Sequence, residues 1–238
     1  MFFKGLSISR GCSLAAAALA VATLGAMAST AQASIILNGD FSANASSFTN
    51  TPGYYGDVAN PNNSNPNNAT NWVPTGNGGV NGTGTGVGNV FGPASLSINT
   101  GGIVADFAFI QGGGTISQNF SATAGQTYTV SFVAGSRNTQ TADFYANVTD
   151  STTSAVLGNL GTSIAPIVPV NTEFTSYSFN FTATADPLVL NLGNSPTGND
   201  ESVSFSNVMA AAVPEPAALG LTGVGALGLL LLKRRKTA

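Results

Sequence analysis

Apolar and polar side chains alternate with a period of two through much of the chain between residues 34 and 212. In the clearest stretch, Tyr128, Val130 and Phe132 alternate with threonine and serine. The same alternation recurs over 177–181, 188–192 and 203–205. Successive side chains of a β-strand point to opposite faces, so each stretch predicts a strand with one apolar and one polar face.

Further strands are predicted in four less regular stretches, 95–99, 103–110, 114–120 and 142–149. Glycine-containing turns are expected between strands, at 112–114, 124–126, 158–161 and 193–198. No part of this region shows a convincing helical period. Many short strands separated by turns predict one all-β domain over residues 34–212, folded as an antiparallel β-sandwich.

One stretch of this domain breaks the alternation. Residues 57–93 are dominated by Asn, Gly and Pro and contain few core-forming side chains, so we expect a long loop or a disordered insertion. Tyr54, Tyr55 and Trp72 lie in or beside it, and exposed aromatic rings can stack on the faces of sugars. These three residues are candidates for glycan binding. The alternative is that the loop packs its own aromatic rings against the sandwich.

The N-terminal 33 residues have the layout of a secretory signal peptide. Lys4 and Arg10 precede an apolar stretch over 14–27, which is followed by the small residues Ala31 and Ala33. This order predicts cleavage after Ala33, with the Sec translocon and signal peptidase as partners. The alternative is a membrane anchor or a buried helix, but the stretch is rich in Ala and shorter than the roughly 20 residues that a membrane span requires.

The C-terminal residues 213–238 combine three features in order. Pro214, Glu215 and Pro216 come first, and their two prolines keep the segment out of a helix and accessible to a partner. The apolar run 217–232, 16 residues long, then predicts a short transmembrane helix of about 24 Å. A basic tail follows, formed by Lys233, Arg234, Arg235 and Lys236. Basic residues favour the cytoplasmic side, so the rest of the chain is expected outside the inner membrane.

This order resembles the PEP-CTERM sorting signal of Gram-negative bacteria over about the last 25 residues. The resemblance implies that Pro214, Glu215 and Pro216 are recognised by an exosortase, a membrane-embedded protease that processes the protein near the motif. It also implies transient membrane insertion, followed by transfer to the cell surface or to an extracellular matrix of exopolysaccharide. The alternative is a plain C-terminal anchor behind an accidental pair of prolines.

Composition excludes several chemistries. The chain has no His, which rules out a Ser-His-Asp triad and His-liganded metal sites. Its one Cys, Cys12, lies in the predicted signal peptide, so the mature chain is expected to have no disulfides and no thiol chemistry. Between residues 34 and 213 there are nine acidic residues and one basic residue, Arg137. Such a surface repels polyanions, so we expect no nucleic-acid partner.

The region between the two terminal signals resembles the jelly-roll domains of the galactose-binding-like superfamily. The resemblance rests on 37–41, Ile116-Ser117-Gln118, 124–132, 177–183 and Ser206-Asn207-Val208. Some domains of this superfamily hold a structural Ca²⁺ between their first and last strands. Asp40, Asp200 and Glu201 are therefore candidate calcium ligands if those strands pair. The alternative is that these are exposed acidic residues that provide solubility.

These observations favour a noncatalytic exported protein with a structural or adhesive role at the cell surface or in the matrix. The alternative is a carbohydrate-binding module with a specific glycan ligand, dependent on Ca²⁺ or independent of it. A glycosidase needs two carboxylates facing each other across a cleft. No local motif selects such a pair here, so we expect no enzyme activity and no cofactor apart from the candidate Ca²⁺.

Overall fold

The computed structural model describes residues 34–43, 45–48, 69–162, 164–184, 186–195 and 200–214. Several predicted features lie outside these residues: the signal peptide with Ala31 and Ala33, Tyr54 and Tyr55, Glu215 and Pro216, the apolar run 217–232 and the basic tail 233–236. Within the described residues, no helix has both the length and the apolar character needed to cross a membrane.

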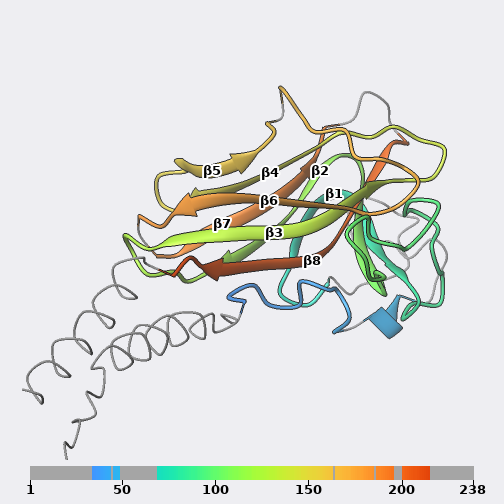
Figure 1. Cartoon of the computed structure of the whole chain (residues 1–238), viewed down its shortest axis with the longest axis horizontal. Helices are drawn as coiled ribbons and strands as arrows, with labels where there is room; N and C mark the ends of the chain where they lie inside the picture. Colours follow the sequence, from blue (N-terminus) through green and yellow to red (C-terminus); the bar gives the residue numbers. More distant parts are fainter. Residues whose placement is uncertain are drawn as a thin grey trace, which may run out of the picture. The chain divides into compact units, whose positions relative to one another are not determined.

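Eight strands and one short 3-10 turn make up the regular structure of the described residues (Figure 1). The turn is Ala45–Ser47, and the strands are β1 (Val73–Gly82), β2 (Asp106–Phe120), β3 (Thr127–Ser136), β4 (Phe144–Asp150), β5 (Val156–Leu160), β6 (Thr175–Thr182), β7 (Leu188–Asn194) and β8 (Ser202–Ala212). All strand pairs are antiparallel. The predicted all-β fold is confirmed, and the period-two stretches form β3, β6, β7 and β8.

The strands form two sheets that share β2. Hydrogen bonding runs in the order β5-β4-β7-β2-β8-β3-β6, and β1 also pairs with β2. The C-terminal half of β2 pairs with β7, whereas its N-terminal half pairs with β8. We call β5-β4-β7-β2 the β4 sheet and β2-β8-β3-β6 the β3 sheet. The strand orders 2-7-4-5 and 8-3-6 are those of a jelly roll, in which two antiparallel sheets pack as a sandwich.

Three glycines in β2 mark the point where it passes from one sheet to the other. The sequence predicted a turn at 112–114, and this prediction is wrong because β2 continues through it. Gly112 has a φ of 66°, a conformation that favours glycine, and β1 is irregular opposite this point. A Cβ on Gly76 would lie 2.8 Å from the carbonyl oxygen of Gly113, so the two backbones approach where no side chain intervenes. The glycines therefore bend the strand instead of ending it.

One hydrophobic core fills the space between the sheets. Phe144 of β4 is fully buried, and its ring centroid lies 5.8 Å from that of Phe132, 5.0 Å from that of Tyr177 and 5.6 Å from that of Phe205. Its three partners belong to β3, β6 and β8, none of which pairs with β4. The contacts therefore cross from one sheet to the other, which confirms the predicted β-sandwich.

A second cluster of buried side chains covers the outside of the β3 sheet near the start of β2. It contains Phe107 and Phe109 of β2, together with Phe91, Val104, Val133 and Phe174. Rings of Phe91 and Phe109 stack with their centroids 4.1 Å apart. The segment 83–105 therefore packs on the sheet, and Phe107-Ala108-Phe109-Ile110 is buried on both of its faces.

The expectation of a loop over 57–93 is wrong for its second half. Val73–Gly82 is strand β1, and the segment that follows it contributes Phe91 to the second cluster.

Two further details of the strands and turns differ from prediction. The stretch 95–99 makes only isolated bridges, and the expected turn at 158–161 is largely strand β5.

The opening segment of the described chain lies along the last strand. The backbone N–H of Ile35 donates to the carbonyl of Ala210, and that of Val208 donates to the carbonyl of Gly39. The side chain of Gln118 fixes the same segment from β2, because its Oε1 accepts from the N–H of Leu37 at 2.8 Å and its Nε2 donates to the Leu37 carbonyl at 2.9 Å. The first segment and the last strand are therefore neighbours, as the sequence resemblance implied.

Candidate functional site

The folded domain ends directly at the sequence motif of the C-terminus. Strand β8 stops at Ala212, yet the N–H of Val213 still donates to the carbonyl of Thr127 at 2.8 Å. The Nε2 of Gln126 donates to the carbonyl of Val213, also at 2.8 Å. Pro214 is exposed, and a proline cannot extend the hydrogen-bonded ladder as a donor. The accessible segment therefore begins at Pro214, without an intervening linker.

Uncharged polar side chains form a row across the outer face of the β4 sheet. In the strand register, Ser117 of β2 is opposite Asn191 of β7, Asn191 is opposite Asn147 of β4, and Asn147 is opposite Asn159 of β5. Residues directly opposite each other in antiparallel strands share a face, so we call these four residues the asparagine row. The Nδ2 of Asn191 donates to Oδ1 of Asn147 at 3.0 Å, which holds the two central amides in a defined orientation.

Tyr145 lies beside the asparagine row on the same face. It is opposite Gly193 in the register, and a Cβ on Gly193 would overlap the Cζ of the Tyr145 ring. The partly exposed ring therefore lies across Gly193, where the neighbouring strand has no side chain. Burial raises the pKa of the Tyr145 phenol further above neutral pH, where the hydroxyl is protonated in any case and able to donate. Tyr145, with Asn147 and Asn159, lines a cavity of about 320 Å³, together with Val156, Gly161 and Thr162.

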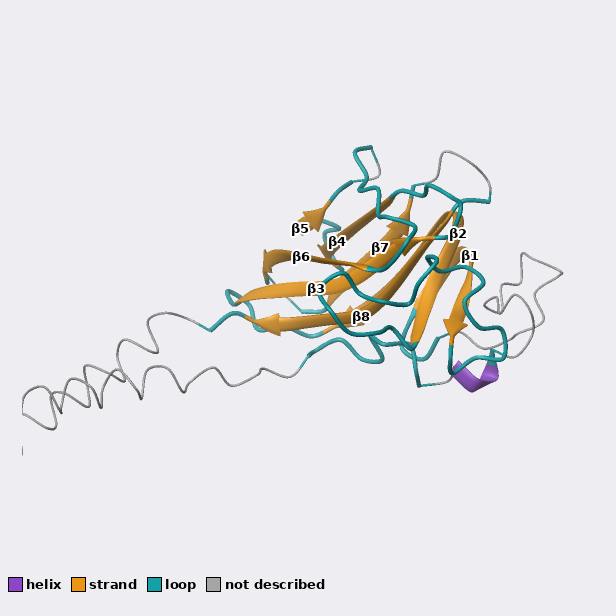
Figure 2. Cartoon of the chain, turned by 45° about the vertical axis from the view of Figure 1, so that its right-hand side comes forward, coloured by secondary structure: helices purple, strands orange, loops and turns teal. Residues whose placement is uncertain are grey.

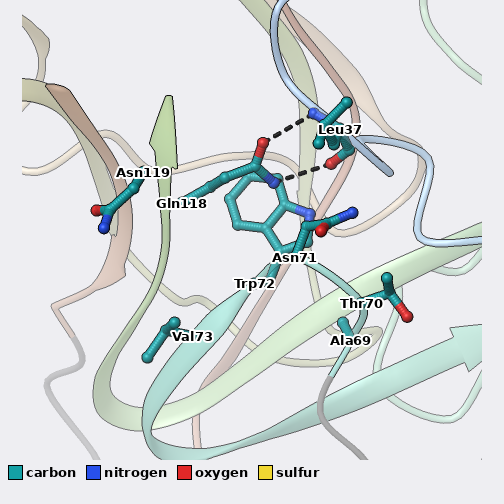
Figure 3. A pocket seen from close by; sticks show the side chains of 8 residues that line it. All are labelled: Leu37, Ala69, Thr70, Asn71, Trp72, Val73, Gln118 and Asn119. Carbon is teal, nitrogen blue, oxygen red and sulfur yellow. Dashed lines mark hydrogen bonds between the residues drawn. The ribbon is translucent and has the colours of Figure 1, made fainter. Parts of the chain in front are cut away.

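A second cavity, of about 420 Å³, lies at the β1 edge of this region (Figure 3). Leu37, Trp72, Val73, Gln118 and Asn119 are among its lining residues. Trp72 is only 2% exposed, its Nε1 donates to the carbonyl of Asn38, and its ring packs 5.2 Å from that of Phe41. The prediction that Trp72 offers an open stacking surface is therefore wrong, because the indole belongs to the core. The alternative, packing against the sandwich, holds for this residue.

The three candidate calcium ligands are not brought together. Asp40 lies next to Gly39, which bonds to Val208 in the second half of β8, and its carboxylate accepts from Ser42. Glu201 lies just before the other end of β8. It is seven residues from Val208, which at 3.3 Å per residue is roughly 23 Å along the strand. Asp200 forms an ion pair with Arg137 at 3.3 Å. Within the described residues no three His, Cys, Asp or Glu side chains form a metal-binding group, so this calcium set is wrong.

Asp106 is a buried acidic residue that the sequence did not single out. It is 6% exposed, and its Oδ1 accepts from the N–H of Gly84 at 2.7 Å. Burial raises the pKa of its carboxyl, the hydrogen bond from Gly84 partly opposes this, and the charge of Asp40 raises the pKa further. The pairing of the opening segment with β8 thus places Asp40 near Asp106 and not near Asp200.

The C-terminal residues 212–236 match the PEP-CTERM protein-sorting motif. The chain carries a PEP-CTERM sorting signal. The sequence-based recognition of this signal is confirmed, and the match spans Pro214, Glu215 and Pro216 together with the following apolar run and basic tail. A PEP-CTERM signal indicates export, processing by an exosortase at the membrane, and a location at the cell surface or outside the cell.

The chain is also similar in fold to solved structures. The CBM22-1 xylan-binding domain of Paenibacillus barcinonensis Xyn10C has 9% identity and a TM-score of 0.42, with 60% of this chain and 86% of that chain covered. TmCBM61, solved with β-1,4-galactotriose, has 9% identity and a TM-score of 0.41, with 60% and 90% covered. A tailspike domain of bacteriophage CBA120 has 16% identity and a TM-score of 0.41, with 76% of this chain but 21% of that chain covered. These are distant likenesses, and no curated protein matches the sequence.

Proposed function

We propose that this protein is a noncatalytic component of the cell surface or exopolysaccharide matrix of a Gram-negative bacterium, with a structural or adhesive role. The proposal rests on the PEP-CTERM signal at residues 212–236, which follows the last strand of the sandwich without a linker. In this view the Sec translocon and signal peptidase export the chain and remove residues 1–33. An exosortase then acts near Pro214-Glu215-Pro216 while the apolar run 217–232 holds the protein in the inner membrane.

A fractionation experiment in the native host tests the sorting step. Pro214, Glu215 and Pro216 are replaced together by alanine, and the intact mass and location of the protein are compared with those of the unchanged protein. The unchanged product should start at Ser34, end near Val213 and lie outside the cell, whereas the variant should stay in the membrane with its tail. Pro166→Ala, a proline substitution within the folded domain, is the control and should be sorted normally.

A different pair of results would contradict the proposal. If the unchanged protein and the triple-alanine variant both keep the C-terminal tail in the membrane, the motif acts only as a linker before an anchor. The protein would then be an ordinary anchored envelope protein.

Carbohydrate binding is the second candidate function. Its support is the uncharged outer face of the β4 sheet, where Tyr145 adjoins amide side chains above a cavity. Sugars are bound by aromatic rings and by side chains that both donate and accept hydrogen bonds. Such a role is compatible with the first proposal, because an adhesive matrix protein has to hold a matrix polymer.

A further inference from the structure

The asparagine row continues across the whole width of one sheet. Its first member, Ser117, is also opposite Val73 of β1, so the register joins β1, β2, β7, β4 and β5 in a single line. Neighbouring strands lie about 4.8 Å apart, so this line is about 19 Å long. Figure 2 shows β1 and β5 at opposite sides of the strands that the line crosses.

Each end of the line opens into a cavity. At the β5 end, Asn147 and Asn159 line the cavity of about 320 Å³ beside Tyr145. At the β1 end, Val73 lines the cavity of about 420 Å³ together with Asn119, the next outward residue of β2 after Ser117. The exposed fraction of the Val73 side chain is 61% and that of Val156, in the other cavity, is 59%. The face therefore offers apolar contact at both ends and polar contact between them.

We propose that this outer face binds a neutral polysaccharide, with the sugar chain running across the strands along the asparagine row and Tyr145 stacking on one sugar ring. The proposal rests on the proposed role at the cell surface or in the matrix, and it names the ligand class and the site for that role. A single sugar would occupy only one cavity, whereas a line of about 19 Å accommodates several consecutive sugar units.

The chemistry of the row matches sugar hydroxyls. A primary amide carries two N–H donors and an acceptor oxygen, and a hydroxyl also donates and accepts, so an asparagine can bind a hydroxyl in either sense. The bond from Asn191 to Asn147 orders both amides before a ligand arrives. Tyr145 is ordered as well, because its ring rests on Gly193. Groups that are already ordered lose less conformational entropy on binding.

The negative charge of the domain favours a neutral polysaccharide over an acidic one. None of the four residues of the asparagine row is charged, and the domain between residues 34 and 213 carries nine acidic residues against Arg137. A polymer of uronic acids would be repelled by this excess of negative charge. Neutral sugars have no such penalty, and their binding should depend little on salt.

Affinity gel electrophoresis of the full-length protein in detergent tests the site. The gels contain one of three neutral polymers, a mixed-linkage β-glucan, a xylan or a galactan, or the polyuronate alginate. At least one neutral polymer should retard the protein and alginate should not. Tyr145→Ala should weaken that binding about tenfold or more, since an aromatic stacking contact and its buried area are lost. Asn147→Ala should weaken it by a smaller factor.

The control variant is Asn180→Ala on the outer face of the β3 sheet, which should bind as the unchanged protein does. The thermal stability of each variant is also measured, so that loss of binding can be told from loss of folding. Gly193→Ala provides a second test of the site, because it displaces the Tyr145 ring without removing it. The site is wrong if no neutral polymer retards the unchanged protein, if alginate binds, or if Tyr145→Ala and Asn180→Ala lose affinity equally. The fractionation experiment is independent, so correct sorting without polymer binding would overturn this site and leave the sorting proposal intact.

Discussion

The two outer faces of the sandwich are built from the same kinds of polar side chain but differ in what lies beside those side chains. On the β3 sheet, Thr129 donates to Oδ1 of Asn180 at 2.8 Å, and the hydroxyls of Thr127 and Thr182 lie 3.2 Å apart. Another part of that face is covered by the segment 83–105. On the β4 sheet, Tyr145 lies beside a cavity and a line of amides.

Polarity alone therefore does not distinguish the proposed binding face from the other one. Side chains pair across strands on both faces, since Asn191 donates to Asn147 on the β4 sheet, and each such pair stabilises its sheet by about 0.2–1 kcal/mol. Amides beside an aromatic ring and a hollow have space for a ligand. Amino-acid substitutions can separate the two faces, and the one with the largest expected effect should damage both.

Phe144→Ala should have the largest effect, because it removes the ring that joins the two sheets. The side chain is fully buried against Phe132, Tyr177 and Phe205, and a Phe to Ala change in a core costs about 3–5 kcal/mol. Denaturant unfolding measures the loss. A change below about 1 kcal/mol would show that the sheets do not pack through this ring.

Gln118→Ala should have the next largest effect and act at the β1 edge only. It removes both hydrogen bonds between the side chain and the backbone of Leu37, which predicts a loss of about 1–3 kcal/mol in the free energy of unfolding. The neighbouring Asn119→Ala, on the exposed outer side of β2, is the control and should change stability by less than about 0.5 kcal/mol. Equal losses in the two variants would contradict the role assigned to Gln118.

Gly193→Ala should leave stability within about 1 kcal/mol while weakening polysaccharide binding on one face. The added methyl group occupies the place of the Tyr145 ring, which has to move. Gly113→Ala is the matched control, because a Cβ there meets no atom within 4 Å. Binding and thermal melting are measured for both. Unchanged binding in Gly193→Ala would mean that the position of the Tyr145 ring is unimportant.

The smallest effects are expected from substitutions of Asp106 in β2 and Asp150 in β4, because the pKa values of these two residues shift in opposite directions. Burial raises the pKa of Asp106, so the folded state holds its proton more tightly and stability falls as the pH rises through the titration of Asp106. Hydrogen bonds from the N–H groups of Thr153 and Thr152 lower the pKa of Asp150, so its contribution is lost as the pH falls through its folded-state pKa.

Unfolding measured between about pH 3 and pH 7 separates these two contributions. Asp106→Asn should remove the fall in stability with rising pH, and Asp150→Asn should remove the rise. Changes of the same sign in the two variants would contradict the assignment.

Sequence pattern predicted those parts of the fold in which side chains alternate strictly. Strand β6 is an example, because Tyr177, Phe179 and Phe181 face inward and the intervening Ser and Asn residues face outward. The C-terminal sorting signal was also readable, since it depends on the order of residues and not on tertiary contacts.

The remaining features depend on contacts between distant segments. Gly78 and Gly79 in β1 are buried by pairing with β2, but glycine has no side chain to reveal a strand. Trp72 lies in a polar stretch and is nevertheless buried, because it donates a hydrogen bond to Asn38 and packs against Phe41 in the opening segment. Tyr145, the central residue of the proposed binding face, was not singled out from the sequence. Its alternation with buried residues marks it as outward-facing, but its place beside Asn191 and Gly193 follows from the register of β4 with β7.

The attachment of the sorting signal to β8 has a mechanical consequence. Strand β8 lies inside its sheet, with β3 along one edge and β2 and the opening segment along the other. A pull applied at Val213 along the axis of β8 would load the hydrogen bonds on both edges of this strand in shear, so many bonds would have to yield together. A tether on an edge strand such as β6 could instead be peeled away one bond at a time. The place of β8 inside its sheet is thus suited to resisting a pull applied at Val213 along the strand.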